Sequence, residues 1–594
     1  VAFFTRGERN GTSSNRNSLS GKAADVNPVV WTQVYGLLIT YSPDYKLDNP
    51  NTAQSRAANF MARQVQGALV DVPESRDYDV AYQFVQEYVM AILYYSTDGP
   101  NWDRQLGFMD NGDDVCAWHE TVDDLVSATF QDVTVAGGFE QGPNGHVIAG
   151  GEDSVMGVQC NEAGEVDYLV IPNNNLKGDL PPEVGLLEAL QHVSLYKNKI
   201  SGSIPNAFQY LNDLHTLVLE DNEMTGSIPD YINEQWTELQ LLSLAYNNLD
   251  GELPDFDGMD KLTQLALNHN GFTGAIDVFD NTPLLEVLLL SNNELDGSFY
   301  PSLLQTIPVR LFDVSNNKLT GQIPPDFYDV EIVDVHNNQL SGNVPAVLWD
   351  DYDYAIRFFS AYGNPNMEGE IPLHIGKLTA LRHLDLSGNG LTGSIPPSVN
   401  HLFNLEYLYL GNNDFDSQDF PYLADLEKLQ ELSLRACAIE DAIPHWMGEW
   451  ISNLVLLDLS DNALSGVIPP NLSQLIEMRF LLLGNNQLEG PIPDSLWDLR
   501  NLNMFTLDHN DQIAADTSIG DVCADDGPFD LQLVVADCSL ECSCCDECCQ
   551  PNDTSCGVSN SPNLDHGYDR FGFDFSDDLS FEATGDDDDD DQDN

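Results

Sequence analysis

Seven aromatic, charged and imidazole side chains in the second half of the chain have residue types that suit contact with a ligand. They stand at similar places in a repeated pattern and are Tyr362, His383, Asp385, Tyr407, Tyr409, Arg435 and Asp458. Tyrosine and arginine anchor many protein interfaces, and aromatic rings also stack on sugars. These residues therefore predict a noncovalent binding site. The alternative is that they are scattered surface groups with no shared role, because Tyr196, Tyr246 and His269 hold similar places elsewhere.

No sequence motif for catalysis accompanies these residues. The chain lacks the GxSxG, HExxH and Walker motifs, a GxGxxG after a strand, and the glycine-rich loop, HRD and DFG of protein kinases. Paired carboxylates carry little information in a chain with 96 acidic residues. We therefore expect a protein that is not an enzyme and that has neither a cofactor nor a catalytic metal.

The candidate residues belong to a pattern that recurs every 21 to 26 residues between about residues 166 and 513. From Leu381 to Pro396 the sequence LRHLDLSGNGLTGSIP reads LxxLxLxxNxLxGxIP. The turn asparagines are Asn174, Asn198, Asn222, Asn247, Asn270, Asn293, Asn317, Asn338, Asn364, Asn389, Asn413, Asn462, Asn486 and Asn510, and Cys437 fills the one missing place. These fifteen units have the period and the L-x-x-L-x-L-x-x-N/C-x-L core of leucine-rich repeats.

Packing explains why such a unit must be repeated. In Leu384-Asp385-Leu386 the leucines of a short strand face a core while the aspartate faces out. The side chain of Asn389 can satisfy backbone groups of the turn that follows. One unit cannot bury its own leucines, whereas a stack forms a continuous core. We predict an α/β repeat fold, a right-handed and curved leucine-rich-repeat solenoid with parallel strands on its concave face, where we place the binding site.

The flanking sequences divide the chain into five parts. Residues 1–28 are polar and rich in Ser, Asn and Gly, which predicts a disordered arm. Residues 29–165 hold three helical patterns and a Gly-rich insert, and predict a helical N-terminal cap over the first repeat. Residues 166–513 are the fifteen repeats, and residues 514–560 are a cysteine-rich C-terminal cap. Residues 561–594 form an acidic tail that we expect to be disordered.

The cysteine-rich cap allows two interpretations. Its cysteines are Cys523, Cys538, Cys542, Cys544, Cys545, Cys548, Cys549 and Cys556. Thiolates at such short spacings can bind zinc, but no paired CxxC motifs occur at the separation of a zinc finger. We favour four disulfide bonds, whose pairing the sequence does not determine. Cys437 is then expected to be a buried, unpaired thiol.

The charge balance limits the range of partners. The chain has 23 basic and 96 acidic residues, for a net charge of −73. Such a field disfavours nucleic acids and anionic membranes, and favours cations, basic proteins or polyamines. The alternative is that the charge provides solubility in a salty medium. The acidic run from Asp586 to Asp591 in the tail predicts, at most, weak binding of calcium.

Several features indicate an extracellular protein. The cysteines concentrate in the flanks of the repeats, which is typical of disulfide-closed ends outside the cytosol. Asn10, Asn471 and Asn552 begin N-glycosylation sequons. The sequence has no run of 18 apolar residues to span a membrane. It begins at Val1 without a Met or a signal-peptide pattern, so we expect a processed or truncated product, such as a secreted protein or a shed ectodomain.

The sequence before the first repeat resembles a known family. Cys116-Ala-Trp118 and Gly157-Val-Gln-Cys160 are similar to the paired Cys-x-Trp and Gly-Val-x-Cys of extracellular plant leucine-rich-repeat proteins. The resemblance implies a disulfide bond between Cys116 and Cys160, and a second short strand after each turn asparagine. The Gly-rich insert between the two motifs departs from the plant pattern. The segments NTAQSRAANFMARQ and QEYVMAILYYSTDGPNW resemble the caps of a diatom leucine-rich-repeat protein group more closely.

The resemblance implies a recognition function. Receptor-like and polygalacturonase-inhibitor-like relatives bind peptides, glycans or other extracellular proteins, and we expect a receptor-like module of this kind without a kinase. Its partner would be an extracellular protein, peptide or glycan held on the concave face. The alternative is an acidic structural, adhesion or biomineral-associated matrix protein in which the solenoid is a spacer.

Overall fold

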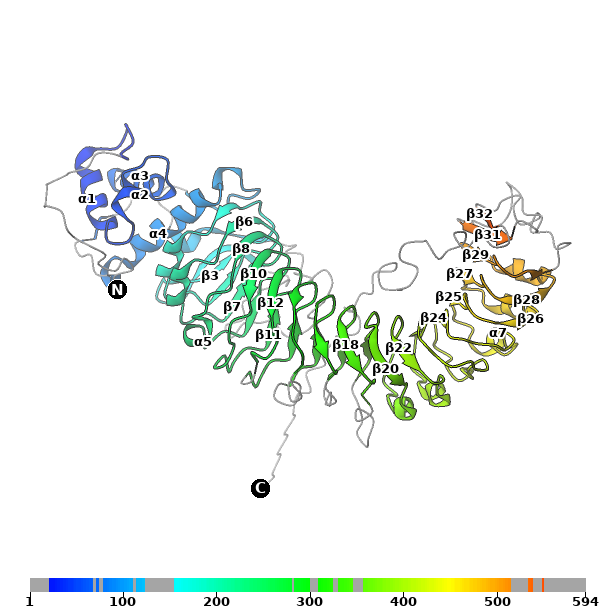
Figure 1. Cartoon of the computed structure of the whole chain (residues 1–594). Helices are drawn as coiled ribbons and strands as arrows, with labels where there is room; N and C mark the ends of the chain where they lie inside the picture. Colours follow the sequence, from blue (N-terminus) through cyan, green and yellow to red (C-terminus); the bar gives the residue numbers. More distant parts are fainter. Residues whose placement is uncertain are drawn as a thin grey trace, which may run out of the picture. The chain divides into compact units, whose positions relative to one another are not determined.

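The computed structural model describes residues 21–67, 71–73, 78–109, 114–122, 154–279, 282–299, 308–323, 330–345, 356–513, 533–537 and 547–549. The structure divides into two compact units. The colours of Figure 1 follow the sequence from the N-terminus to the C-terminus. The first unit comprises the described residues up to Asp250, and the second unit begins at Gly251. Each unit is described separately below.

Helices begin the first unit, as the apolar spacing predicts. They are α1 (Pro28–Leu38), α2 (Asp44–Leu47), α3 (Ala53–Gln66) and α4 (Tyr78–Ser96), followed by the 3-10 helices η1 (Gly99–Asn101) and η2 (Val115–Ala117). The side chain of Asn27 caps α1, and that of Thr52 caps α3. The predicted apolar stripe of α1 is confirmed, because Trp31 and Val34 are both fully buried.

The residues just before α1 are packed, contrary to the expectation of a disordered arm as far as residue 28. The backbone N–H of Ala23 donates to Asn59 Oδ1 at 2.6 Å, and Asn59 Nδ2 donates to the carbonyl of Gly21 at 2.8 Å. Val26 is buried. The amide of one helical asparagine therefore fixes this segment to α3, which the polar composition did not reveal. Residues 1–20 lie outside the described part.

A buried polar network joins the helices to the first repeat. Glu183 in η3 (Pro182–Leu186) is 3% exposed, and its carboxylate accepts hydrogen bonds from Ser42 Oγ at 2.8 Å and Gln54 Nε2 at 3.1 Å. The hydroxyl of Tyr88 on α4 in turn donates to Ser42 Oγ at 2.9 Å. A buried carboxylate needs such donors. The network therefore specifies how the helices cover the open end of the repeats.

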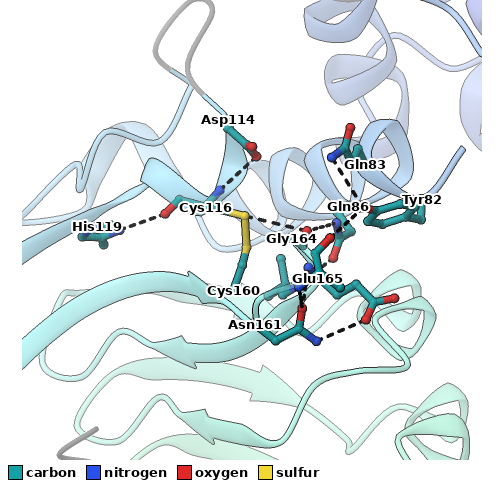
Figure 2. The surroundings of a disulfide bond; sticks show 12 residues. Tyr82, Gln83, Gln86, Asp114, Cys116, His119, Cys160, Asn161, Gly164 and Glu165 are labelled. Carbon is teal, nitrogen blue, oxygen red and sulfur yellow. Dashed lines mark hydrogen bonds between the residues drawn. A yellow bond between two sulfur atoms is a disulfide. The ribbon is translucent and has the colours of Figure 1, made fainter. Parts of the chain in front are cut away.

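A disulfide bond closes the same region, and Figure 2 shows its surroundings. Cys116 on η2 is bonded to Cys160 at the end of β2 (Ser154–Cys160), as the family resemblance implied. Gln86 on α4 accepts from the N–H of Val166 at 2.6 Å and donates to the carbonyl of Gly164 at 3.2 Å. The bond and these contacts tie η2, α4 and the first strands together.

The strands of the first unit form two ladders. The first ladder contains β1 (His119–Val122), β2, β3 (Val166–Val170), β5 (His192–Ser194), β7 (Thr216–Val218) and β9 (Leu241–Ser243). It is antiparallel from β1 to β3 and parallel from β3 to β9. The second ladder is parallel and contains β4 (Lys177–Asp179), β6 (Lys199–Gly202), β8 (Glu223–Gly226) and β10 (Asn248–Glu252). The helices η4 (Asn206–Tyr210) and α5 (Ile232–Gln235) lie in the connections.

The second unit repeats this plan. Its main parallel ladder contains β11 (Gln264–Ala266), β13 (Val287–Leu289), β15 (Leu311–Asp313), β17 (Ile332–Asp334), β19 (Phe358–Ser360), β21 (His383–Asp385), β23 (Tyr407–Tyr409), β24 (Glu431–Ser433), β25 (Leu456–Asp458), β27 (Phe480–Leu482) and β29 (Met504–Thr506). The backbones of β31 (Leu533–Asp537) and β32 (Glu547–Cys549) continue it in parallel. The rest of the predicted cysteine-rich cap, residues 514–532, 538–546 and 550–560, lies outside the described residues.

Short second strands follow most of the turns, as the resemblance to plant repeats implied. They are β12 (Gly271–Gly274), β14 (Glu294–Leu295), β16 (Thr320–Gly321), β18 (Gln339–Gly342), β20 (Asn366–Glu370), β22 (Gly390–Thr392), β26 (Ser465–Gly466), β28 (Gln487–Gly490) and β30 (Gln512–Ile513). The connections contain η6 (Leu373–Lys377), η7 (Pro397–His401), α7 (Met447–Trp450), η8 (Pro470–Gln474) and η9 (Asp494–Asp498). Between β22 and β26 this ladder is reduced to isolated parallel bridges, of Gln418 to Ile439 and of Ala442 to Ser465.

The turn asparagines hold successive repeats together, which confirms the role predicted for them. Asn389 Nδ2 donates to the carbonyl of Leu386 in its own repeat at 2.8 Å, and to that of Ala361 in the preceding repeat at 3.1 Å. Its Oδ1 accepts from the N–H of Asn364 at 2.8 Å. Asn364 makes the same contacts one repeat earlier, with Val335, Ala361 and Leu340. Each buried amide therefore satisfies backbone groups of two repeats.

Cys437 stands in the place of one asparagine in this series. Its side chain is fully buried and not disulfide-bonded, as predicted, and its thiol donates to the carbonyl of Leu410 at 3.4 Å. The thiol thus keeps the contact with the preceding repeat, and Gln418 Nε2 adds a hydrogen bond to the carbonyl of Cys437 at 3.0 Å. Gln418 Oε1 accepts from the N–H of Ile395 at 2.9 Å. Burial raises the pKa of the Cys437 thiol.

The asparagine ladder leads to a stability prediction. Replacing Asn389→Ala removes three buried hydrogen-bonding contacts and should lower the free energy of unfolding by about 3 kcal/mol. The matched control is Asn453→Ala, because Asn453 is exposed and donates one hydrogen bond to the carbonyl of Glu427. Urea unfolding followed by circular dichroism measures both. Equal losses in the two variants would contradict a special role for the ladder.

Cys437 provides a second prediction. Its buried, protonated thiol should not react with a maleimide in the folded protein, and should react with one equivalent after denaturation without reductant. Mass spectrometry after digestion locates the label, and Cys437→Ser is the control that removes it. Rapid labelling of Cys437 in the native protein, or labelling of Cys116 or Cys160 before reduction, would show that this thiol assignment is wrong.

Candidate functional site

The predicted site residues lie in or next to strands of the second unit. We call the outward side chains of β11 to β29 the strand face. The ladder pairs His383 with Tyr407 and Asp385 with Tyr409, so these four residues lie on neighbouring strands, β21 and β23. Asp458 ends β25, two strands further on. Tyr362 lies two residues after β19 and stacks on His336. Arg435 lies two residues after β24 and pairs with Asp461.

The expectation that these side chains are exposed is wrong for five of them. The exposed fractions are 1% for His383, 0% for Asp385, 2% for Tyr409, 4% for Asp458 and 8% for Tyr362. Only Tyr407 and Arg435 are partly exposed. Whether any of the seven binds a ligand stays a prediction, and the burial leaves Tyr407 and Arg435 as the members best placed to touch one.

Stacking between neighbouring strands explains the burial. Parallel strands lie about 4.8 Å apart, which is close to the spacing of stacked rings. The ring centroids of Phe358 and His383 are 4.3 Å apart, and those of His383 and Tyr407 are 5.6 Å apart. His336 and Tyr362 stack in the same way at 4.4 Å. Equivalent aromatic side chains in successive repeats therefore cover one another, which the alternation within one strand does not predict.

Burial also determines the protonation states of His383 and Tyr409. It lowers the pKa of His383 to about 3, with a smaller contribution from the charge of His336, so His383 is neutral at physiological pH. Burial raises the pKa of Tyr409, and its hydroxyl donates to Glu431 Oε2 at 2.5 Å. Arg435 Nε lies 2.7 Å from Asp461 Oδ2. These groups are thus already engaged within the protein.

A histidine and two aspartates form a titratable cluster at the ends of β15 and β17. Asp313 and Asp334 are partners in the ladder, and His336 Nδ1 lies 2.5 Å from Asp334 Oδ1. Burial, with the nearby charge of Asp334, raises the pKa of Asp313 to about 6. Burial by itself would lower the pKa of His336, but the carboxylates of Asp334, Asp313 and Asp385 outweigh it and raise that pKa.

A row of charged side chains that the sequence reasoning missed borders the strand face. Its members directly precede the strands β15, β17, β19, β21 and β23 and are Arg310, Glu331, Arg357, Arg382 and Glu406. Arg310 pairs with Glu331, and the Nε of Arg357 lies 3.7 Å from the same carboxylate. Arg382 forms two hydrogen bonds to Glu406, at 3.0 and 3.1 Å.

Arg357 and Arg382 stand next to each other in this row. The N–H of Arg382 donates to the carbonyl of Arg357 at 2.8 Å, and the side chains of Arg382 and Arg357 are 36% and 45% exposed, respectively. Each guanidinium group already pairs with one glutamate, and its exposed part can still donate to a carboxylate of a ligand. Aligning the residue after the first leucine of each repeat would have found this row in the sequence, because a basic pair is unusual in so acidic a chain.

Comparison with known proteins agrees with this architecture. The family model for Leucine Rich Repeat matches residues 189–211, 309–330, 380–402, 453–475 and 477–499. These segments are leucine-rich repeats. The chain is 30% identical over 212 residues to Receptor-like protein 18 of Arabidopsis thaliana, which covers 31% of this chain and 25% of that protein. The chain thus spans about a quarter of the length of this curated relative.

Solved ectodomains of plant receptors have a similar fold. That of the membrane receptor kinase GASSHO1/SCHENGEN3 from Arabidopsis thaliana, in complex with CASPARIAN STRIP INTEGRITY FACTOR 2, matches with a TM-score of 0.52 and 30% identity, covering 57% of this chain and 44% of that chain. The Arabidopsis receptor kinase HAESA, in complex with the peptide hormone IDA and the co-receptor SERK1, matches with a TM-score of 0.52 and 27% identity, covering 59% and 62%. The predicted resemblance to a diatom group finds no support among these relatives.

Of the predicted glycosylation sites, the structure describes only Asn471. Asn471 lies on η8 and its Nδ2 donates to Glu449 Oε1 at 2.7 Å, whereas Asn10 and Asn552 lie outside the described residues. The side chains of the eight cysteines from Cys523 to Cys556 also lie outside the described part. Among the described residues, no group of three or more His, Cys, Asp or Glu side chains is arranged to hold a metal ion. Within that same part, no helix is long and apolar enough to cross a membrane.

The cluster of Asp313, Asp334 and His336 predicts an unusual pH dependence. Both raised pKa values mean that the folded state binds protons more tightly than the unfolded state, so their contribution to stability is present at low pH. For Asp313 it is lost as the pH rises from about 4 through about 6, and for His336 it is lost as the pH rises above 6.5.

Replacing Asp313→Asn should therefore leave the unfolding free energy nearly unchanged at pH 4 and raise it at pH 8 by at most about 3 kcal/mol, relative to the unmodified protein. Urea titrations at both pH values measure this difference. Asp277→Asn, at an exposed carboxylate, is the control and should have the same small effect at both. A larger gain for Asp313→Asn at pH 4 than at pH 8 would contradict the raised pKa.

Proposed function

We propose that the chain is an extracellular recognition module that binds a peptide through the strand face of its second unit. The similarity to receptor-like proteins and to receptor ectodomains of plants supports this proposal. One of those ectodomains was solved in complex with CASPARIAN STRIP INTEGRITY FACTOR 2, and the other with the peptide hormone IDA and the co-receptor SERK1. The placement at the cell surface, and a binding rather than a catalytic role for this chain, are part of the same proposal.

The two partly exposed arginines directly before the adjacent strands β19 and β21, Arg357 and Arg382, are the observation that carries the proposal. Their backbones are hydrogen-bonded to each other, each side chain also pairs with a glutamate, and Tyr407 on β23 is next in the ladder. An extended peptide that presents a carboxylate could bind both arginines and place an apolar side chain against Tyr407. A neutral glycan would bring no negative charge to the two guanidinium groups, so we favour a peptide with acidic groups.

Peptide selection can test this function while the natural ligand is unidentified. We would display a library of random 12-residue peptides on phage and select binders to the unmodified chain. We expect enriched sequences with acidic residues, whose binding weakens at least about tenfold in the double variant Arg357→Ala, Arg382→Ala. Arg500→Ala is the matched control, because it removes an exposed arginine that lies outside the strand face.

Two results would contradict the proposal. Enriched peptides that bind the double variant as tightly as the unmodified chain would place the site elsewhere, with the region around residues 119–154 as the second choice. Failure to enrich any peptide, together with retention of the protein in insoluble extracellular material, would favour the structural or matrix alternative. Thermal unfolding of each variant confirms that the substitutions have not unfolded the second unit.

A further inference from the structure

Four aromatic side chains form a patch outside the strand face, in the connections that precede β24 and β25. Phe420, Tyr422, Trp446 and Trp450 are its members, and we call them the aromatic patch. Tyr422 is 51% exposed and Trp450 is 47% exposed, whereas Phe420 and Trp446 are half-buried. The rings of Tyr422 and Trp446 are 5.6 Å apart, and Phe420 and Trp450 adjoin them at 6.2 and 6.4 Å. Contiguous exposed aromatic surface of this kind marks an interaction site.

The patch coincides with the repeats that depart from the common pattern. Aligned on their turn residues, the repeat of Asn413 has Asp419 and Phe420 where the preceding repeat has Ile395 and Pro396. Its second strand is reduced to the single bridge of Gln418 to Ile439, and only isolated bridges continue the second ladder from β22 to β26. Core packing does not require exposed rings here. The place of Tyr422 holds a serine at Ser398 and a fully buried ring at Phe256, so the exposure of the ring sets Tyr422 apart.

Ring geometry decides which kind of partner the patch suits. The planes of Tyr422 and Trp446 meet at 61°, those of Phe420 and Trp446 at 76°, and those of Tyr422 and Trp450 at 80°. Sugars stack on flat, exposed ring faces, and rings at such angles do not make one flat platform. The exposed faces of Tyr422 and Trp450 can instead each contact a cation.

Carboxylates surround the rings. Asp419 precedes Phe420, and Glu449 precedes Trp450 on α7, and both acids are exposed. The N–H of Glu440 donates to the carbonyl of Gln418 at 3.0 Å, which places Glu440 and the next residue, Asp441, beside Asp419. Residues 413–450 hold nine acidic residues against Lys428 and Arg435. Lys428 bonds to Asn404, and Arg435 pairs with Asp461. The local field therefore attracts cations.

We propose that the aromatic patch is a second interaction surface, which binds lysine or arginine side chains of a basic polypeptide. The cationic group lies against the faces of Tyr422 and Trp450, and the exposed carboxylates of Asp419 and Glu449 pair with further basic residues of the same segment. This site is separate from the strand face, where the exposed groups of the charged row are arginines. A chain with both surfaces binds an acidic ligand at one and a basic protein at the other.

Octalysine labelled with fluorescein is the probe that tests this surface. Fluorescence anisotropy compares the full chain with the double variant Tyr422→Leu, Trp450→Leu, which keeps apolar side chains at both positions but removes the ring faces. We expect binding about tenfold weaker in the variant. Leu373→Ala is the control for an exposed apolar side chain, since Leu373 is 71% exposed in another repeat, and it should bind like the unmodified protein.

Charge and salt separate specific binding from attraction to the acidic chain as a whole. Glu449→Gln should weaken octalysine binding, whereas Glu286→Gln, at an exposed acid directly before β13, should not. In about 0.5 M NaCl the unmodified protein should retain measurable affinity and the double leucine variant should lose it, because salt screens the diffuse field more than close contacts.

Two outcomes would overturn the proposal. Equal affinity of the unmodified protein and the double leucine variant for octalysine would show that only the diffuse negative charge attracts it. Variant-sensitive binding of cellohexaose, without variant-sensitive binding of octalysine, would identify a carbohydrate platform instead. Circular dichroism and thermal unfolding establish that the variants are folded, and substitution of Tyr422→Leu alone gives a milder test with the same expected direction.

Discussion

The hydrogen bonds of the turn asparagines are the constraint on which the rest of the structure depends. Each amide joins its own turn to the preceding repeat, as Asn389 does with Leu386, Ala361 and Asn364. A buried turn without these bonds would leave backbone groups unpaired, at a cost that one short repeat could not offset. The bonds therefore hold each strand one ladder spacing from the next, and the leucines of successive repeats close into one core within each unit.

That spacing also determines the chemistry of the outward side chains. Because strands repeat at about 4.8 Å, rings at equivalent places stack, as Phe358, His383 and Tyr407 do. Stacking removes His383 from water and keeps it neutral, while the carboxylates around His336 keep that imidazole easier to protonate. Two histidines on one face thus have opposite pKa shifts. His383 begins its strand whereas His336 follows its strand by two residues, and the side chains around each place differ.

The sequence was sufficient for features that depend on one repeat, and insufficient for features that depend on several. The alternation around Leu384 and the role of Asn389 follow from a single unit, and both were predicted correctly. The unpaired state of Cys437 followed from counting thiols. The exposure of His383, Asp385 and Tyr409 could not be predicted in the same way, because their neighbours lie about 25 residues away in the chain. The placement of Arg357 and Arg382 directly before adjacent strands was missed for the same reason.

The regularity of the fold gives its exceptions a meaning that composition alone cannot provide. In a stack of similar repeats, the core and the turns restrict most positions, so an unusual residue at an outward position is not required by packing. The arginines directly before adjacent strands of this acidic chain, Arg357 and Arg382, are of this type. The rings of the aromatic patch are of this type as well. The two departures differ in charge as well as in place. A single spacer function would require neither, and two surfaces of opposite electrostatic character fit a protein that holds two different partners.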